Sequence, residues 1–303
     1  MSFFTGLAAY PITPADPDGI VDAEGLRRLV RRLVEARVDA IGLLGSTGTY
    51  PYLSRAERRR AIEAAVEEAG GVLPVMAGVG ALRTDEAVAL AKDAKAAGAS
   101  AGLLAPVSYT PLTEAEVFVH FQTVAGESGL PICIYNNPAT THFTFTPDLE
   151  ARLSAIPGIV AVKNGAPAAG AAAHLADLRA RMPAGFSLGY AADPNAAEAM
   201  IAGADVWHSV LAGVLPAPVL AVTRAAQRGD AAEAQRLNAA LAPIWRLFAE
   251  LSGLRVAYAV ANALQLVRAA PPRPILPLPA ADEARVGRAL ETVAASVASL
   301  QRV

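Results

Sequence analysis

The stretch Gly6-Leu7-Ala8-Ala9-Tyr10-Pro11-Ile12-Thr13-Pro14 decides the fold. It begins with a short apolar run that predicts a buried strand. The rest of the chain alternates such runs with helical patterns, as both a (β/α)8 barrel and an open doubly wound sheet would. A doubly wound sheet usually places a glycine-rich phosphate loop after its first strand. Because Pro11-Ile12-Thr13-Pro14 cannot cradle a pyrophosphate, we expect the barrel.

Eight short apolar runs predict the strands of this barrel. They cover residues 6–10, 40–44, 74–79, 101–105, 131–135, 159–163, 187–190 and 205–210. Between them, Ser54 with Glu57 and Thr113 with Glu116 have the spacing of capping boxes at helix starts. The alternation predicts an α/β protein with a TIM (β/α)8 barrel over residues 1–216, whose active site lies at the carboxyl ends of the strands.

The remainder of the chain carries helical patterns without strands. The predicted helices cover residues 218–228, 231–251, 255–267 and 281–300, and a proline-rich run at 271–279 interrupts them. We interpret that run as an extended spacer. Residues 217–303 are therefore expected to form C-terminal helices packed on the barrel, and not a separable functional domain.

Composition excludes several classes of partner. The 303 residues are 53% hydrophobic and 18% charged, with a formal net charge of -2. This balance gives no reason to expect nucleic acid or an anionic membrane as partner. The first residues lack the pattern of a signal peptide, and no uninterrupted apolar stretch reaches the ~18 residues of a membrane span. The single cysteine, Cys133, lies in an apolar run and should be buried and inert. We expect a cytoplasmic protein.

Lys163 ends the apolar run Ile159-Val160-Ala161-Val162-Lys163, which lies between two turn signals. Burial at a strand end disfavours the ammonium form and lowers the pKa of a lysine. A free amine near neutral pH is what Schiff-base chemistry with a carbonyl substrate requires. The alternative is a lysine whose amine extends from the strand end into water.

Two other strand ends carry polar groups. Gly45-Ser46-Thr47-Gly48-Thr49-Tyr50 follows the second strand, and its hydroxyls and amides could bind a small carboxylate or merely form a turn. Tyr135-Asn136-Asn137-Pro138 ends the fifth strand. If Tyr135 points inward, its phenol can relay a proton near Lys163; otherwise its ring only packs.

These three motifs, in this order and on these strands, resemble the dihydrodipicolinate synthase / N-acetylneuraminate lyase superfamily of class I, Schiff-base-forming aldolases. The similarity covers residues 6–216, more faintly beyond. It implies a TIM barrel, usually assembled as a tetramer, and chemistry without a metal or organic cofactor. Lys163 would then be the nucleophile and Tyr135, hydrogen-bonded to Thr47, the proton relay. Ser46, Thr47 and Gly48 would bind the carboxylate of pyruvate or another 2-oxo acid.

The chain departs from the pattern of the superfamily at several positions. Thr140 stands where the synthase has an arginine for the carboxylate of aspartate semialdehyde, and we expect Thr140 to line the substrate pocket instead. Tyr109 is a single tyrosine where the superfamily has two, one of which reaches the neighbouring subunit, so it is a relay or interface candidate only. His208 replaces a usually aliphatic residue that faces the 2-oxo acid; it could bind a substrate hydroxyl or be satisfied by a backbone carbonyl. Gly189 is also expected beside the substrate.

The expected activity is that of a lyase. A lysine Schiff base with pyruvate or another 2-oxo acid would lead to aldol cleavage or condensation, or to dehydration of a 2-keto-3-deoxy acid. A true 4-hydroxy-tetrahydrodipicolinate synthase and a non-catalytic 2-oxo-acid-binding barrel remain alternatives. A metal- or phosphate-dependent barrel enzyme is less favoured, because the four histidines lack ligand-like spacing. The expected partners are small molecules and one or three further copies of the chain, in a homodimer or homotetramer.

Overall fold

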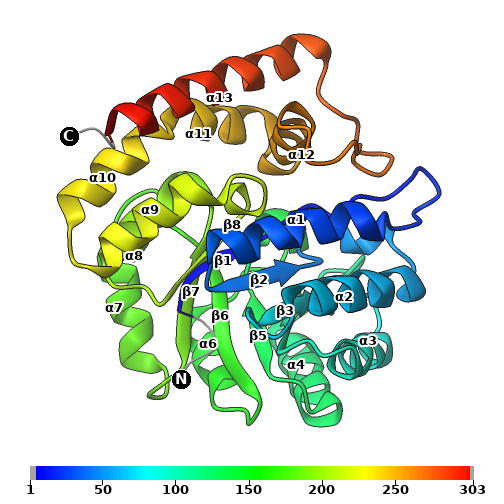
Figure 1. The fold of residues 1–303 in the computed structure, drawn as a ribbon. Coiled ribbons are helices and arrows are strands. Elements are labelled where there is room, and N and C mark those ends of the chain that lie inside the picture. Colours follow the sequence, from blue (N-terminus) through cyan, green and yellow to red (C-terminus); the bar gives the residue numbers. More distant parts are fainter. Residues whose placement is uncertain (1–4, 301–303) are drawn as a thin grey trace.

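A computed structural model describes residues 5–300 as a closed barrel of eight parallel strands, in the order β1 to β8 around the barrel (Figure 1). The strands are β1 (Gly6–Ala9), β2 (Ala40–Leu43), β3 (Val75–Gly78), β4 (Ala101–Leu104), β5 (Ile132–Tyr135), β6 (Ile159–Gly165), β7 (Ser187–Ala191) and β8 (Val206–Ser209). Residues 1–4, which belong to the segment judged not to be a signal peptide, lie outside the described part. The predicted TIM barrel is confirmed.

Strand β6 is longer than the sequence predicts. We expected a turn after Lys163, but β6 continues to Gly165 because Asn164 pairs with Tyr190 and Gly165 with Ala191 of β7. Lys163 therefore lies inside a paired strand and not at its end. Its backbone is held by the register with Tyr135 on one side and Gly189 on the other.

The helices on the outside of the barrel follow the expected alternation. They are α1 (Ala23–Ala36), α2 (Arg55–Ala69), α3 (Thr84–Ala96), α4 (Glu114–Ser128), α5 (Pro138–Thr141), α6 (Pro147–Ser154), α7 (Ala171–Arg181), α8 (Asp193–Ile201) and α9 (Pro216–Gln227), with single 3-10 turns η1 (Tyr50–Tyr52) and η2 (Leu211–Gly213). The capping box at Thr113 and Glu116 is complete, whereas the Ser54 hydroxyl accepts from the Glu57 amide without the reciprocal bond. These caps place the helix starts where the sequence puts them.

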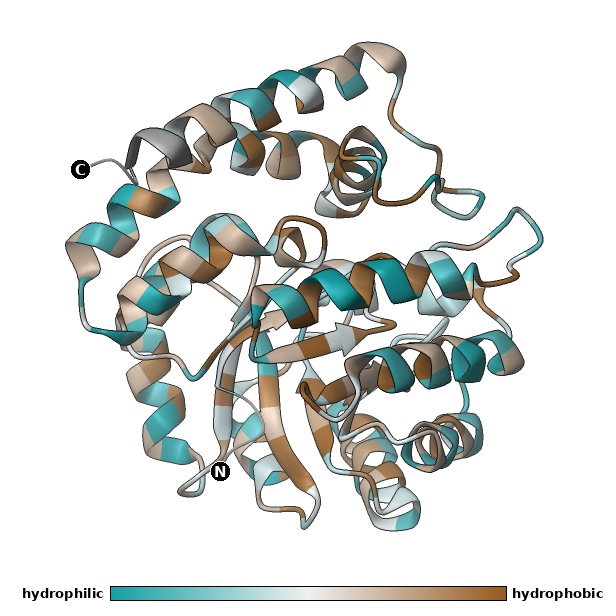
Figure 2. Ribbon diagram, in the orientation of Figure 1, coloured by the Kyte–Doolittle hydropathy of each residue, from teal (hydrophilic) through white to brown (hydrophobic). Residues whose placement is uncertain are grey.

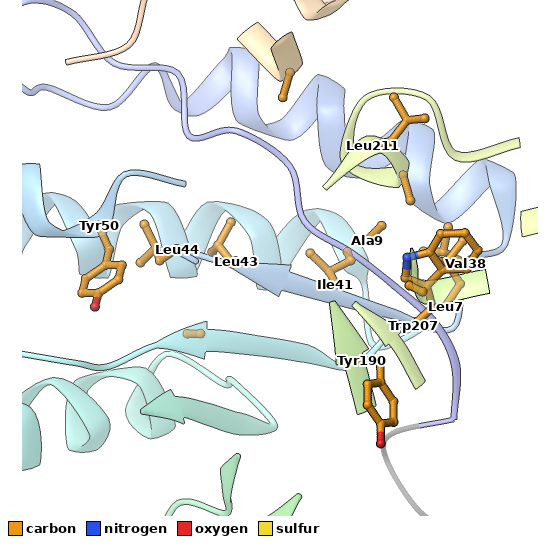
Figure 3. Packing of buried hydrophobic residues seen from close by; sticks show 14 of the residues in the cluster. Leu7, Ala9, Val38, Ile41, Leu43, Leu44, Tyr50, Tyr190, Trp207 and Leu211 are labelled. Carbon is orange, nitrogen blue, oxygen red and sulfur yellow. The ribbon is translucent and has the colours of Figure 1, made fainter. Parts of the chain in front are cut away.

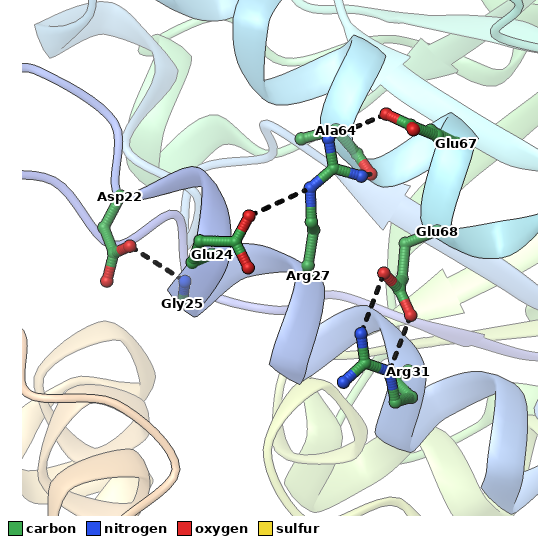
Figure 4. A network of polar contacts seen from close by, with 8 residues as sticks. All are labelled: Asp22, Glu24, Gly25, Arg27, Arg31, Ala64, Glu67 and Glu68. Carbon is green, nitrogen blue, oxygen red and sulfur yellow. Dashed lines mark hydrogen bonds and ion pairs between the residues drawn. The ribbon is translucent and has the colours of Figure 1, made fainter.

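Two kinds of contact hold the helices on the barrel. Apolar side chains dominate the strands and alternate with polar ones along the helices (Figure 2). Leu7 and Trp207, paired across β1 and β8, lie next to Val38 in the main cluster of buried hydrophobic residues (Figure 3). At the surface, Arg27 binds Glu67 at 2.7 Å and Arg31 binds Glu68 at 2.7 Å, so that polar pairs fix α1 against α2 (Figure 4).

The C-terminal helices form a layer on one side of the barrel (top in Figure 1). They are α10 (Ala231–Ala240), α11 (Ala242–Leu251), α12 (Gly253–Ala263) and α13 (Ala280–Leu300). The expectation of one helix over 231–251 was wrong: the chain breaks at Leu241, because Pro243 can occupy a first turn but not a helix interior.

Helix α9 packs against β1, α8 and α1, in the place of the eighth barrel helix. The expected boundary at residue 216 separates α9 from these contacts. We therefore propose to end the barrel after α9, with α10 packing onto α9 and α8 as the first of the appended helices. No helix within residues 5–300 is both long and apolar enough to cross a membrane.

Candidate active site

Four side chains point into the barrel near the carboxyl ends of its strands. Tyr10 follows β1, Tyr135 ends β5, and Lys163 and His208 lie on β6 and β8. Residues two positions apart on a strand face the same side, so each of these side chains has a small or apolar inward neighbour two positions earlier. Those neighbours are Ala8, Cys133, Ala161 and Val206, all buried in the barrel interior. The interior is thus polar at the carboxyl ends of the strands and apolar one layer further toward their amino ends.

The amine of Lys163 is enclosed by aromatic rings. Its side chain is 4% exposed, and Nζ lies 3.7 Å from the centre of the Tyr10 ring and 4.7 Å from that of Tyr135. Burial lowers the pKa of Lys163, although Tyr135, Cys133 and Asp193 partly oppose that shift. Strand β6 therefore holds a lysine with an increased share of the nucleophilic free amine, and the alternative of an amine extended into water is wrong.

The phenol of Tyr135 lies in a small hydrogen-bond network. Its oxygen is 3.0 Å from Ser46 Oγ and accepts from Asn137 Nδ2 at 2.7 Å. Burial raises the pKa of Tyr135, but the Lys163 charge and the hydrogen bonds with Asn137, Ser46 and Thr140 outweigh it, and the net pKa lies below the usual value. A phenol of lowered pKa beside an amine is suited to moving protons.

The hydroxyl that meets Tyr135 is not the expected one. We predicted Thr47 at this position, whereas the structure places Ser46 there and buries Thr47, which is 6% exposed. The loop after β2 that carries both residues has positive φ angles of 54° at Leu44 and 52° at Thr49. Such angles are costly for residues with a Cβ and are concentrated at functional sites.

Gly48 has no space for a side chain. An added Cβ would lie 2.9 Å from Leu44 Cα and 3.0 Å from Thr13 Oγ1. The loop therefore folds back so that Gly48 lies against the backbone of Leu44, directly after β2. The sequence indicated a binding loop here, but not which hydroxyl faces the phenol.

Tyr10 is a site residue that sequence reasoning missed. Its hydroxyl lies 3.0 Å from His208 Nδ1, and both side chains are almost completely buried. Burial raises the pKa of Tyr10 and lowers that of His208 well below its usual value, so the pair is neutral across the physiological range. His208 is thus satisfied by a phenol and not by the backbone carbonyl we considered. The sequence signal available for Tyr10 was strand alternation: it lies two residues after Ala8 and therefore on the same, inward side.

Two glycines make room for this Tyr10–His208 pair. A Cβ on Gly42 would lie 2.2 Å from Tyr10 Cζ, and one on Gly189 would lie 2.2 Å from His208 Nε2. Gly189 does lie next to Lys163, in register with it on β7. The histidine ring occupies the space where a side chain at position 189 would lie, so the need for glycine there is explained without a bound substrate.

The two remaining candidates lie toward the surface. Thr140 is exposed on α5, donates to Asn137 O at 3.3 Å and also interacts with the Tyr135 phenol. Tyr109 is 97% exposed, so within one chain it is not part of the Lys163 site. Within residues 5–300, no cluster of three or more His, Cys, Asp or Glu side chains is arranged to hold a metal ion.

A (β/α)8 barrel with a buried amine beside a phenol has the architecture of an enzyme suited to carbonyl chemistry. The comparisons with known proteins define its family. The sequence model of the dihydrodipicolinate synthetase family matches residues 3–293, and the chain belongs to this family. It is a lyase of that family, as the resemblance in the sequence implied.

Relatives of known name agree with this membership. The 4-hydroxy-tetrahydrodipicolinate synthase of Thiobacillus denitrificans is 38% identical over 252 residues, 83% of this chain and 84% of that protein. A crystal structure of dihydrodipicolinate synthase from Agrobacterium tumefaciens is 55% identical, with a TM-score of 0.94 over 96% of this chain and 98% of the other. The pyruvate complex of the enzyme from Acinetobacter baumannii is 30% identical, with a TM-score of 0.88 over 96% and 99% of the two chains.

Proposed function

We propose that Lys163 forms a Schiff base with pyruvate or a related 2-oxo acid, and that the resulting enamine makes or breaks a bond at the adjacent carbon. The observation that carries this proposal is the buried amine of lowered pKa, 4.7 Å from the ring of a phenol of lowered pKa. The pyruvate complex of the Acinetobacter baumannii relative supports the choice of first substrate.

The chemistry follows from these groups. The Lys163 lone pair adds to the keto carbon, and the carbinolamine loses water to give a protonated imine. Loss of a proton from the neighbouring carbon gives the enamine. The enamine either attacks an aldehyde or expels a hydroxyl as water; carbon–carbon cleavage is the reverse of the attack. Tyr135 carries the protons between the imine nitrogen, the carbinolamine oxygen and the second reactant.

The loop after β2 is the proposed carboxylate site. Thr47 and the amides that lead into Gly48 would bind the carboxylate of the 2-oxo acid, and Ser46 would both contact it and hold the Tyr135 phenol. Gly189 and His208 would lie at the side of the bound acid. A helix-free loop of fixed backbone amides is a common way to bind a small anion.

The second reactant is proposed to lack a carboxylate opposite Thr140. A hydroxyl cannot supply the bidentate, charge-assisted contact of an arginine. A 2-keto-3-deoxy acid, cleaved or dehydrated, fits Thr140 and the nearby Thr141. The second candidate is the synthase reaction with aspartate semialdehyde, which is favoured by the names of the relatives from Thiobacillus denitrificans and Agrobacterium tumefaciens.

Borohydride trapping tests the first step. Reduction in the presence of pyruvate should add mass to the peptide that contains Lys163, and Lys163→Arg should abolish the adduct and the activity while retaining the melting temperature. An adduct on another lysine, or none with any 2-oxo acid, would contradict the proposal. A panel of 2-keto-3-deoxy acids beside pyruvate plus aspartate semialdehyde then decides between the two second reactants.

We also propose that the chain assembles as a homodimer or homotetramer through the face near β4. Leu82 and Val119 are 66% and 57% exposed there, beside a pocket of about 450 Å³, and Tyr109 projects from the adjoining loop. Exposed apolar side chains gathered in this way are typical of an interface. Light scattering of the wild type and of Val119→Arg tests this; a monomeric wild type would contradict it. A cytoplasmic location is proposed on the sequence alone.

A further inference from the structure

Glu150 of α6 is a buried carboxyl that the mechanism above does not use. It is 2% exposed and lies outside the barrel, on a helix that packs against β6. Its Oε1 accepts from Asn136 Nδ2 at 2.8 Å and its Oε2 from Asn164 Nδ2 at 3.4 Å. Asn136 Nδ2 also donates to Asn164 Oδ1 at 2.9 Å. We call these three residues the β5–β6 clamp.

Each amide of the clamp is bonded in sequence to a residue of the site. Asn136 follows Tyr135 and Asn164 follows Lys163, and successive side chains of a strand face opposite sides. The amides therefore point outward to Glu150 while the phenol and amine point inward. A backbone hydrogen bond also joins the two segments next to the site, because the backbone N–H of Asn136 donates to Lys163 O at 3.0 Å. Moving either amide thus moves the neighbouring inward group.

We propose that Glu150 is a positioning residue, which sets the distance between Tyr135 and Lys163 through Asn136 and Asn164, and that it does so most firmly when ionised. The inference rests on the proposed Schiff-base function for its catalytic consequence, but not for the contacts themselves. Nothing in the reaction requires Glu150 to touch the substrate.

The donors and acceptors of the clamp match an ionised carboxylate. Both asparagines direct N–H groups at Glu150, and a carboxylate accepts on both oxygens. A protonated Glu150 carries a hydrogen that competes with one of these donors. Asn136 Oδ1 is buried and has no partner among the described residues, so turning that amide would give the acid hydrogen an acceptor. Protonation therefore favours a different arrangement of Asn136.

Glu150 changes its protonation state near neutral pH. Burial raises the pKa of Glu150 to about 7, although the hydrogen bonds from Asn136 and Asn164 oppose that shift. The facing titratable group on β7 is Tyr190, whose pKa is raised chiefly by burial and further by Glu150, and which bonds His174 Nδ1 of α7 at 2.8 Å. Arg179 of α7 partly opposes that rise.

Two further titratable groups, on α7 and α4, lie near the clamp. Burial lowers the pKa of His174. On α4, the carboxylate of Glu114 is exposed and accepts from Thr146 Oγ1 at the start of α6. On the inner side of the two strands lie Tyr135 and Lys163 themselves. Glu150→Gln removes the titration of Glu150 and leaves Lys163 and His174 in place, so this variant separates Glu150 from its titratable neighbours.

The test is the pH dependence of a rate ratio. The rate of imine trapping with pyruvate is measured for wild type and Glu150→Gln between about pH 5.5 and about pH 8.5. We expect the rate of wild type divided by that of Glu150→Gln to rise with pH as Glu150 loses its proton near neutrality. The ratio should reach on the order of 10-fold, since small misplacements of a reacting group have effects of this size or larger. Dividing the rates removes the titration of Lys163, which both proteins share.

Controls and a second readout make the outcome decisive. Glu114→Gln and His174→Gln, which remove neighbouring titratable groups outside the clamp, should leave the pH dependence unchanged. Labelling of Lys163 by a neutral amine reagent should show the same pH-dependent ratio without any substrate. A ratio that does not vary with pH in either readout would overturn the inference, whereas labelling that follows the prediction without pyruvate trapping would contradict only the proposed function.

Asn164→Ser supplies a second variant if Glu150→Gln does not fold. It retains Glu150 but removes one donor arm, so the advantage of the wild type should again appear at high pH and disappear at low pH. An equal loss at all pH values would show that the clamp is only structural.

Discussion

The inner and outer faces of the β5–β6 pair bury ionisable groups of opposite type. Inside the barrel, burial lowers the pKa of Lys163; outside it, burial raises the pKa of Glu150 to about 7. One physical cause, the loss of water around a charge, thus brings a base and an acid toward neutrality from opposite directions. The difference lies in the partners: aromatic rings surround the amine, whereas amide donors hold the carboxyl. Burial therefore shifts the pKa of an ionisable group toward neutral pH on both sides of the same two strands.

The largest effect should come from the inner face, with Tyr135→Phe. Removing the phenol takes away the proton relay while the ring still packs, and a general acid–base group contributes ~10²–10⁴-fold to kcat. Imine trapping should become slow but remain on Lys163. Steady-state turnover and trapping rates check this, and a variant with nearly normal kcat would remove Tyr135 from the relay.

The outer face should control how stability depends on pH. The pKa of Glu150 is about 7 in the folded protein and ordinarily 4.5, so the folded state retains a proton that the unfolded chain has released between these values. The contribution of this group to stability is complete below pH 4.5 and is lost as the pH rises through about 7, an amount of about 3 kcal/mol.

Glu150→Gln is neutral throughout and lacks this loss. Its free energy of unfolding relative to wild type should therefore increase between about pH 5 and about pH 8. Urea unfolding at both pH values measures the change. Parallel pH dependences in the two proteins would place the Glu150 pKa near its ordinary value and would weaken the comparison of the two faces.

Tyr10→Phe should sharpen the comparison within the inner face. The change keeps the ring against Lys163 but leaves His208 Nδ1 buried without its phenol partner, which costs ~1–3 kcal/mol. The loss should appear in the free energy of unfolding more than in kcat, because the hydroxyl points away from the amine toward His208. Thermal melts and kinetics of the same preparation separate the two effects.

The smallest effect concerns the loop after β2. Ser46→Ala removes the hydroxyl 3.0 Å from the Tyr135 oxygen, at a cost of about 1 kcal/mol, or somewhat less than tenfold in rate. Thr47→Val should change KM for the 2-oxo acid rather than proton transfer. Rate–pH profiles of both variants test this division of roles, and an unchanged profile for Ser46→Ala with a changed one for Thr47→Val would restore the original assignment of Thr47.

The features predicted from sequence are those with a local signature. Apolar runs between turn signals gave all eight strands, and Lys163 and Tyr135 were recognisable because each ends such a run. The C-terminal break at Leu241 was missed because helical periodicity continues across Pro243. Ser46, and not Thr47, meets the Tyr135 phenol in a loop whose positive φ angle at Leu44 no residue pattern predicts.

The tertiary contacts of the buried polar side chains could not be read from the sequence. Tyr10 and His208 are 198 positions apart and meet only because β1 pairs with β8. Glu150 lies between Asp148 and Arg152 in a short helix and has the sequence context of a surface carboxylate. Its burial follows from the packing of α6 against β6. Tertiary packing, and not local propensity, determined both.

The glycines beneath the two rings also limit how this barrel can change. Tyr10 and His208 fill volume that Gly42 and Gly189 leave empty, so the interior tolerates an exchange of large for small only across both partners of a pair. Shortening His208 alone would open a void next to Lys163, whereas adding a methyl at Gly189 in the same chain would refill part of it. The sizes of the side chains at positions 189 and 208 together determine how much space remains next to Lys163. A library that varies positions 189 and 208 together should therefore yield more folded variants with altered acceptance of substrate chain length than one that varies either position alone.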